Sequence, residues 1–377
     1  LLMCPARDPN SLLSNGSVCF LNYDLAYGGT EKVIASLANH FNASGRKVTI
    51  LTLSSRNDFK NFIHPEIKII SLNISRVKFL IPSLIRFISM QQFDNFIANV
   101  WPLTSLSFVI RIFSRKTRLI YVEHCNLSEQ FKKRSLIFKA IQKISIYIFY
   151  KFAHLVVSVS KGVRDDLISK GVQPKKIKVI YNPIISKPMI PINSLIKGVQ
   201  SWMNSSKQKL IAVGELKSQK NFINLVEAIA FAKKDLNLDI NLLILGDGDQ
   251  RESIQNKINS SDLSENIFLA GWVKDPLPYF NLADLFVLSS DYEGFGVVIV
   301  EAMSQGLNIV STDCKSGPSE ILLDGSLGVL CKVNDCKSLG KAIDYALKNP
   351  IDSTALIRRS EEFSENKIGK LYEEVLI

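Results

Sequence analysis

The sequence predicts an α/β protein with two doubly wound, Rossmann-like domains that face each other across a cleft. Short runs rich in β-branched residues alternate with helical patterns, as in parallel sheets wrapped by helices. This alternation stops at a polar segment that contains prolines and then starts again. The chain has 377 residues, 46% of them hydrophobic. That length and composition suit two cores in domains of roughly 100 to 200 residues.

The first half of the chain carries the first set of strands. The run SVCFLNY at 17–23 leads into a Gly-Gly turn and a helical pattern, and RKVTILTL at 46–53 follows. Further strands are expected at 94–100, 117–124, 154–160 and 176–183. We therefore expect a first domain over residues 1–185, built on a parallel sheet.

The second half repeats the pattern after a linker that we expect at residues 186–208. A helix is expected from about 221 to 234, and strands are expected at 209–216, 240–249, 266–273, 283–290 and 307–313. We assign residues 209–360 to a second domain. The tail at 361–377 has a helical pattern, and we expect it to pack back on the first domain.

The charge balance favours anionic partners. Lysine and arginine number 46 against 35 acidic residues, which gives a net charge of +11. Nucleotides, phosphorylated substrates, anionic membranes and nucleic acid all fit such a charge. A nucleic-acid partner is not expected, because no stacking or recognition motif accompanies the charge.

Cysteine usage and hydropathy bear on the compartment. The six cysteines show no paired or zinc-type spacing, which indicates reduced thiols in a cytoplasmic protein. The first residues lack the apolar core of a signal peptide. The sequence has no uninterrupted apolar run of the roughly 18 to 20 residues that a transmembrane helix needs.

The segment DYEGFGVVIVEAMSQG at 291–306 places two carboxylates at a strand-to-helix joint. Free N–H groups and the helix dipole make such a joint an anion site, and Gly294 and Gly296 would let a ligand approach the backbone. Glu301 could accept hydrogen bonds from ribose hydroxyls, and Glu293 could accept them from sugar hydroxyls. Alternatively, the two acids are a helix cap and a neutralised core acid. Spacing alone leaves both interpretations open.

Residues 293–306, together with LNIVSTDCKSGPSEIL at 307–322, resemble the E-x7-E signature of retaining glycosyltransferases of family four, which have the GT-B fold. The resemblance extends in order over nearly the whole chain. It implies that Glu301 binds the nucleotide ribose and that Glu293 contacts the donor sugar. The loop between them would touch the donor through Gly294, Phe295, Gly296 and Val297.

Other segments are similar to the same family. Gly28 and Gly29 match its first loop, near the donor phosphate or the acceptor, although an ordinary strand-to-helix turn would look alike. His124 ends a strand, as does a histidine beside the donor sugar in family members, although a lone histidine is more often structural. The turn GDGDQR at 246–251 matches a Gly-rich turn. Backbone contacts to the base are expected at Trp272 and Val273.

One position departs from the family pattern. In GELKSQKNF, Gly214 and Lys220 match, but Glu215 stands where the family usually has an arginine that binds the diphosphate. A carboxylate there would repel the diphosphate, whereas an arginine would attract it. Lys217 could compensate, Glu215 could turn away, or the activity could be weakened.

The resemblance implies a retaining transfer of a hexose or N-acetylhexosamine from a nucleotide sugar, with UDP favoured, to a glycan or lipid-linked glycan. Glu293, His124 and Lys220 would take part in catalysis. No cofactor and no metal ion are expected, because no Asp-x-Asp motif lies in a suitable loop. The alternative is a non-catalytic or weakly active sugar-nucleotide-binding protein. An NAD-dependent oxidoreductase is not indicated, because the G-x-G-x-x-G motif is missing after the first strand.

The region 128–152 mixes six cations with many large apolar residues. Such a segment could lie on an anionic membrane or meet a lipid diphosphate. It could equally be a helix that covers the first sheet with its lysines in solvent. The membrane interpretation places the protein peripherally on the inner face of the cell membrane.

Overall fold

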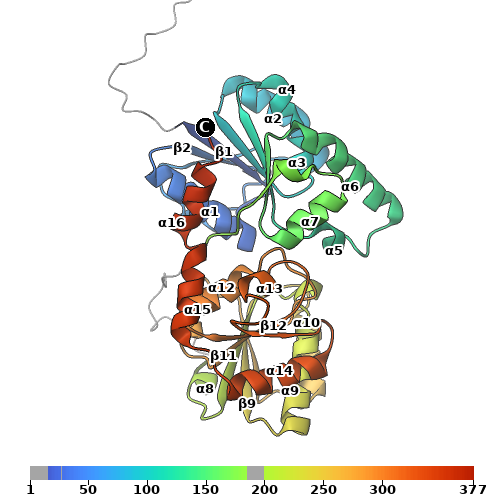
Figure 1. Cartoon of the computed structure of the whole chain (residues 1–377), viewed down its shortest axis with the longest axis vertical. Coiled ribbons are helices and arrows are strands. Elements are labelled where there is room, and N and C mark those ends of the chain that lie inside the picture. The colour runs from blue at the N-terminus through green and yellow to red at the C-terminus, as the bar shows by residue number, and fades with distance from the viewer. Residues whose placement is uncertain (1–15, 27, 185–198) are drawn as a thin grey trace, which may run out of the picture. The chain divides into compact units, whose positions relative to one another are not determined.

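A computed structural model of the chain describes residues 16–26, 28–184 and 199–377 (Figure 1). These residues divide into two compact units. The first unit contains the residues up to 122, together with 145–156 and 369–377. The second unit contains 123–144 and 157–368, so it includes two segments of the first half of the chain as well as most of the second half.

A seven-stranded sheet carries the first half of the chain. Its strand order is β3-β2-β1-β4-β5-β6-β7, and the pairs from β3 through β5 are parallel. The strands are β1 (Ser17–Asn22), β2 (Lys47–Thr52), β3 (Lys68–Ser71), β4 (Asn95–Asn99), β5 (Arg118–Glu123), β6 (Leu155–Ser158) and β7 (Ile177–Val179). The helices of this half are α1 (Gly29–Ala43), α2 (Leu80–Met90), α3 (Leu103–Leu106), α4 (Phe108–Phe113), α5 (Leu127–Gln130), α6 (Leu136–Phe149) and α7 (Lys161–Ser169).

A six-stranded parallel sheet carries the second half, with the order β10-β9-β8-β11-β12-β13. Its strands are β8 (Gln208–Val213), β9 (Ile240–Leu245), β10 (Ile267–Gly271), β11 (Leu285–Leu288), β12 (Asn308–Thr312) and β13 (Val329–Cys331). The helices are α8 (Gln200–Met203), α9 (Phe222–Leu236), α10 (Arg251–Ser260), α11 (Leu277–Phe280), α12 (Val297–Ser304), α13 (Pro318–Ile321), α14 (Cys336–Lys348), α15 (Ser353–Ser360) and α16 (Glu365–Glu373). The predicted fold class, two doubly wound parallel sheets with helices, is confirmed.

The strand predictions differ from the structure in their ends and in two omissions. Each predicted strand overlaps an observed one, but β3 and β13 are not among the predictions. They have only four and three residues, too few for a period-2 pattern to stand out. Of the predicted linker, residues 186–198 lie outside the described residues. Residues 200–203 form α8, in which Trp202 is fully buried.

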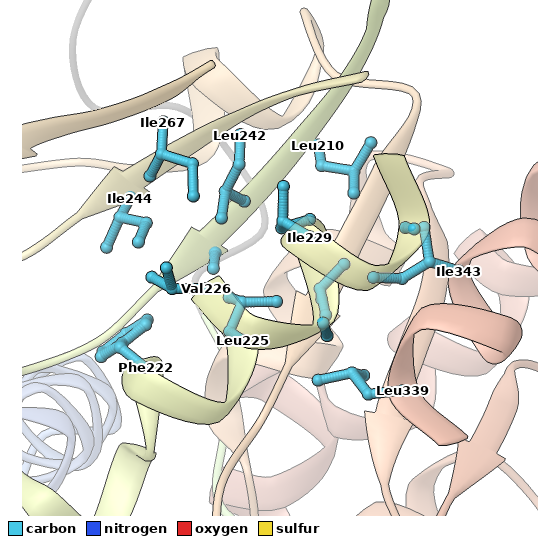
Figure 2. Packing of buried hydrophobic residues seen from close by; sticks show 14 of the residues in the cluster. Leu210, Phe222, Leu225, Val226, Ile229, Leu242, Ile244, Ile267, Leu339 and Ile343 are labelled. Atoms are coloured by element: carbon cyan, nitrogen blue, oxygen red, sulfur yellow. The ribbon is translucent and has the colours of Figure 1, made fainter. Parts of the chain in front are cut away.

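The core of the second sheet explains why the loop after β8 has a defined shape. Helix α9 buries Phe222, Leu225, Val226 and Ile229, at the i, i+3, i+4, i+7 spacing of one helix face, against strand residues such as Leu242 (Figure 2). Burying each such side chain stabilises the fold by about 1.5–3 kcal/mol. This packing fixes the amino end of α9, which directly follows the loop that connects it to β8.

Helix α9 begins at an unusual cap. Asn221 has φ +48, in the left-handed region, and its side chain accepts a hydrogen bond from the backbone N–H of Asn224. Asparagine tolerates this conformation better than most residues and is also a good helix cap. The position of Lys220, the preceding residue, is therefore set by the start of a buried helix.

The carboxyl-terminal residues belong to the first unit. The amide nitrogen of Asn95 donates to the carbonyl of Ile377 at 3.0 Å, and the backbone N–H of Ile377 donates back to Asn95 at 3.1 Å. Arg118 donates to the carbonyl of Val375 at 2.7 Å. Residues 369–377 thus bind strands β4 and β5 near their amino ends.

Among the residues that the structure describes, none of the helices combines the length and the apolar character needed to cross a bilayer.

Candidate active site

The second sheet has one point where its strand order reverses. Strand β8 is central, the chain moves outward through β9 and β10, and it then returns to the other side of β8 as β11. Open parallel sheets bind ligands outside the carboxyl ends of the strands at such a switch point. The loops that leave β8 and β11 are therefore where a ligand site is expected.

Lys220 and Glu293 meet at this point. The Lys220 Nζ lies 2.6 Å from the Glu293 Oε1, and their side chains are only 15% and 8% exposed. The two residues come from different loops, 73 positions apart in the sequence. A nearly buried ion pair at a switch point places one positive and one negative charge within reach of a single small ligand.

Two serines at the end of β11 orient this pair. The Ser290 hydroxyl donates to the same Glu293 oxygen at 2.6 Å. The Ser289 hydroxyl donates to the backbone carbonyl of Lys220 at 2.8 Å. Sequence reasoning did not identify either serine. The available signal is that two serines directly follow the four apolar residues LFVL in the run ADLFVLSS.

Gly294 stands where a side chain would not fit. A Cβ at this position would lie 1.7 Å from the backbone carbonyl oxygen of His124. The Gly294 carbonyl also accepts a hydrogen bond of 2.7 Å from Ser160, which caps helix α7. The loop after β11 and the residue that follows β5 are therefore in backbone contact within the second unit.

His124 is buried in this contact. Its side chain is 6% exposed, and burial lowers the pKa of His124 to about 4. The imidazole is therefore neutral at pH 7, and it can donate or accept a hydrogen bond without adding charge. The charged residues of the site also act on the pKa of the neighbouring Cys125. Its pKa is raised to about 11, chiefly by burial, while Lys217 and Lys220 act to lower it.

Helix α12 starts at the same loop. Gly296 caps it with φ +97, a conformation that L-residues rarely adopt, and Val297 is its first residue. Glu301 follows on the second turn and is 4% exposed. Phe295 is buried, and its ring packs against the rings of Tyr181 and Phe363, with a centroid-to-centroid distance of 5.3 Å in each case. Any ligand contact by Phe295 would therefore come from its backbone.

Glu215 is neutralised by a neighbour. Its carboxylate lies 2.8 Å from the Lys217 ammonium, and the two side chains are 64% and 40% exposed. Burial acts to lower the pKa of Lys217, but the hydrogen bond and charge of Glu215 and the charges of Cys125 and Glu293 raise it, and the net shift is upward. Of the three possibilities raised by the sequence, this geometry matches compensation by Lys217.

Replacing Glu215 by arginine is therefore expected to tighten binding of the nucleotide-sugar donor that the sequence resemblance implies. The change removes a carboxylate and leaves Lys217 without its partner, so two cations would face the diphosphate. We expect the dissociation constant measured by calorimetry to fall about tenfold, which corresponds to about 1.4 kcal/mol. Glu215→Gln, which is neutral, should give an intermediate value. An unchanged or weaker affinity in the arginine variant would show that Glu215 has its own role.

The Gly-rich turn after β9 lies against the loop after β8. Gly246 has φ +148, and a Cβ on it would lie 1.9 Å from the carbonyl oxygen of Gly214. The Gly246 N–H donates to the carbonyl of Gly271 at 2.8 Å. Trp272, which is 42% exposed, and Val273 follow Gly271 directly. The residues predicted to contact the base thus lie along the same strand-end edge as Gly214.

Gly28 and Gly29 belong to the first unit, whereas the other predicted site residues belong to the second. Gly28 precedes helix α1 in an extended conformation, and Gly29 is its first residue. Among the described residues, and apart from its chain neighbours and the backbone of its own helix, a Cβ on Gly29 would meet no atom within 4 Å. Packing against these residues therefore does not explain the glycine at position 29.

Glu320 is a further residue that sequence reasoning did not single out. Its carboxylate accepts hydrogen bonds from the backbone N–H of Lys161 at 2.8 Å and of Gly162 at 3.0 Å, and from the Tyr181 hydroxyl at 3.2 Å. It therefore closes the amino end of α7, beside the cap residue Ser160. This role is structural, and it holds the segment after β6 against the loop after β12.

In the described part of the chain, no cluster of three or more histidine, cysteine or carboxylate side chains is arranged to hold a metal ion.

Comparison with known proteins identifies related chains over nearly the whole length. Residues 199–365 match the family model described as Glycosyl transferases group 1, and residues 27–186 match the model described as Glycosyltransferase Family 4. A Campylobacter jejuni protein, the N-acetylgalactosamine-N,N'-diacetylbacillosaminyl-diphospho-undecaprenol 4-alpha-N-acetylgalactosaminyltransferase, is 27% identical over 343 residues, covering 87% of this chain and 89% of its own length. The amylovoran biosynthesis glycosyltransferase AmsD of Erwinia amylovora is 26% identical, with coverages of 79% and 80%.

Among solved structures, HepE of Anabaena in complex with UDP-glucose superposes with a TM-score of 0.78. The superposition covers 96% of this chain and 99% of HepE, at 19% identity. At that identity the likeness establishes the fold.

Proposed function

The chain belongs to the group 1 glycosyltransferases and has the GT-B fold; on this premise we propose that it moves a hexose or N-acetylhexosamine from UDP to a glycan acceptor. Residues 209–360 would bind the nucleotide sugar, and residues 1–185 would bind the acceptor. The observation that carries the proposal is the Lys220–Glu293 pair at the switch point of the second sheet. The Campylobacter transferase and the UDP-glucose complex of HepE support the sugar class and the nucleotide.

The proposed chemistry follows from charge. When the glycosidic bond to the diphosphate breaks, negative charge grows on the phosphate oxygen, and positive charge grows on the anomeric carbon. Lys220 and the positive end of the α12 helix dipole would stabilise the phosphate, and Glu293 would face the sugar. Because these groups already supply positive charge, we propose that no metal ion is needed.

We propose that the anomeric configuration is retained. The acceptor hydroxyl would attack on the face from which the diphosphate leaves, and its proton would pass to the departing phosphate oxygen. Neutral His124 would donate a hydrogen bond to a hydroxyl of the donor sugar. Glu301 would accept hydrogen bonds from the ribose.

A donor screen tests the proposal. We expect UDP-sugars to raise the melting temperature of the protein more than GDP- or ADP-sugars do. The preferred donor should also be hydrolysed slowly without acceptor, and EDTA should not change the rate. Stabilisation without hydrolysis or transfer would favour the second candidate, a non-catalytic sugar-nucleotide-binding protein. Glu215, in place of the usual arginine, is the observation that favours that candidate.

We further propose that the acceptor glycan is lipid-linked and that the enzyme works peripherally on the inner face of the cell membrane. The Campylobacter relative is named as a transferase that acts on a diphospho-undecaprenol glycan. The net charge of +11 and the basic region 128–152 suit an anionic surface. These observations concern the acceptor and the membrane, and they do not depend on the assignment of the donor site.

A further inference from the structure

Helix α6 has two apolar faces. One face is covered by the protein, and Gln142 and Ile146 on it are buried. The other face is uncovered. Its members are Leu136, Ile137, Ile141, Ile144, Tyr147 and Ile148, with exposures of 81%, 75%, 59%, 57%, 52% and 43%. The isoleucines at 137, 141, 144 and 148 have the spacing of a single helix face. We name these six residues the α6 apolar face.

The uncovered face holds six large apolar side chains that are each at least 43% exposed. An amphipathic helix normally turns polar residues to water and keeps a single apolar stripe for the core. Contiguous exposed apolar patches usually mark a contact with a partner or a membrane. The second apolar stripe of α6 therefore needs an occupant.

The surrounding charges identify the kind of occupant. Residues 131–164 contain no aspartate or glutamate, and the cations in and around α6 are Lys132, Lys133, Arg134, Lys139, Lys143 and Lys151. Two of them sit over aromatic rings, Arg134 at 5.6 Å from the Phe138 ring and Lys151 at 4.0 Å from the Tyr147 ring. A second copy of this chain would bring the same cations together, and like charges repel. An anionic surface matches the pattern.

We propose that the α6 apolar face inserts into the interface of a bilayer that contains anionic lipid. Aliphatic side chains would enter the boundary between head groups and acyl chains, and the lysines would contact the head groups. The inference deepens the proposed function, because it names the surface by which the enzyme would reach a lipid-linked acceptor.

Helix α6 also contacts the residues at the carboxyl ends of the first sheet, where the acceptor is proposed to bind. The indole N–H of Trp101 donates to the Ser145 hydroxyl on α6 at 2.9 Å. Trp101 lies just beyond the carboxyl end of β4, and β1 and β4 flank the point where the strand order of the first sheet reverses. Ser145 therefore ties the last turns of α6 to the residues that follow β4, at the edge where the first sheet is expected to bind its ligand.

Vesicle flotation with the full chain tests the proposal. Wild-type protein should float with vesicles of phosphatidylcholine and phosphatidylglycerol, and it should float less with phosphatidylcholine alone. The variant Ile137→Ser/Ile141→Ser/Ile144→Ser should bind the mixed vesicles at least about tenfold more weakly, because it removes three exposed aliphatic groups that would enter the bilayer. A triple variant that binds as well as wild type, or a wild type that fails to bind at low salt, would overturn the proposal.

Two controls keep this result interpretable. Tyr345 on α14 is 59% exposed but lies outside the α6 apolar face, so Tyr345→Ser should leave flotation unchanged. The thermal shift by UDP-sugar should be the same in all variants, which shows that the fold and the donor site are intact. Wild-type dimers that become monomers in the triple variant would assign the face to a second copy and overturn the membrane proposal.

Failure of this inference is distinguishable from failure of the proposed function. Flotation is measured without donor or acceptor, so it does not depend on transfer activity. Vesicle binding without any glycosyl transfer would refute the function only. Transfer to a soluble acceptor without vesicle binding would refute the membrane surface only.

Discussion

Glu301→Ala is expected to lower kcat/KM for the nucleotide-sugar donor by at least about 100-fold. Glu301 is 4% exposed on the second turn of α12, and we propose that it accepts hydrogen bonds from two ribose hydroxyls. A hydrogen bond to a charged group contributes about 1.5–3 kcal/mol, and about 1.4 kcal/mol is a factor of ten. Steady-state kinetics with the preferred UDP-sugar measure the loss.

The matched control is Glu301→Gln, which keeps the shape of the side chain and one acceptor oxygen. It should lose less activity than Glu301→Ala, and its melting temperature should lie closer to that of wild type. If Glu301→Ala is fully active, Glu301 does not hold the donor, and the assignment of the site is wrong.

Lys220→Met is expected to lower kcat by about 100- to 1,000-fold. Removing one group that stabilises developing charge in a water-excluded site typically has an effect of this size. The methionine fills a similar volume but carries no charge, so the diphosphate would lose its nearest cation. Single-turnover measurements with saturating donor separate this loss from a change in donor affinity.

The same change leaves Glu293 as a buried carboxylate without its cation. Breaking a buried ion pair from one side costs about 3–5 kcal/mol, so the single variant should also melt at a lower temperature. Lys220→Met/Glu293→Gln removes both charges and should recover most of the stability, because Ser290 can still donate to the amide oxygen. Recovery of activity along with stability would contradict a catalytic role for Lys220.

The fold was largely predictable because most of its strands are long apolar runs bounded by turn residues. The two omitted strands, β3 and β13, lie at sheet edges and are too short to show a period. Each pairs with the preceding strand of the chain, with partner residues such as Thr49 and Lys68 or Val310 and Val329 on the two strands, so its position is set by contacts outside its own short sequence. Local propensity does not contain that information.

The site was predictable to the extent that it depends on a local motif. The glutamates at 293 and 301 and the glycines between them were identified from one continuous segment. Gly294 lies so close to the His124 carbonyl that a Cβ would not fit between them. These residues are 170 positions apart, so no local sequence pattern predicts their contact. Compensation by Lys217 was among the alternatives for Glu215, and the ion pair between the two side chains is seen only in the structure.

The return of residues 369–377 to the first unit has a consequence for biosynthesis. Domains generally fold from the amino terminus while the ribosome adds roughly 5–20 residues per second. Here Asn95 and Arg118 cannot form their hydrogen bonds to Ile377 and Val375 until those last residues have been translated. The nascent first sheet must therefore persist with these strand ends uncovered while the second half of the chain is synthesised, and during that period they are accessible to chaperones.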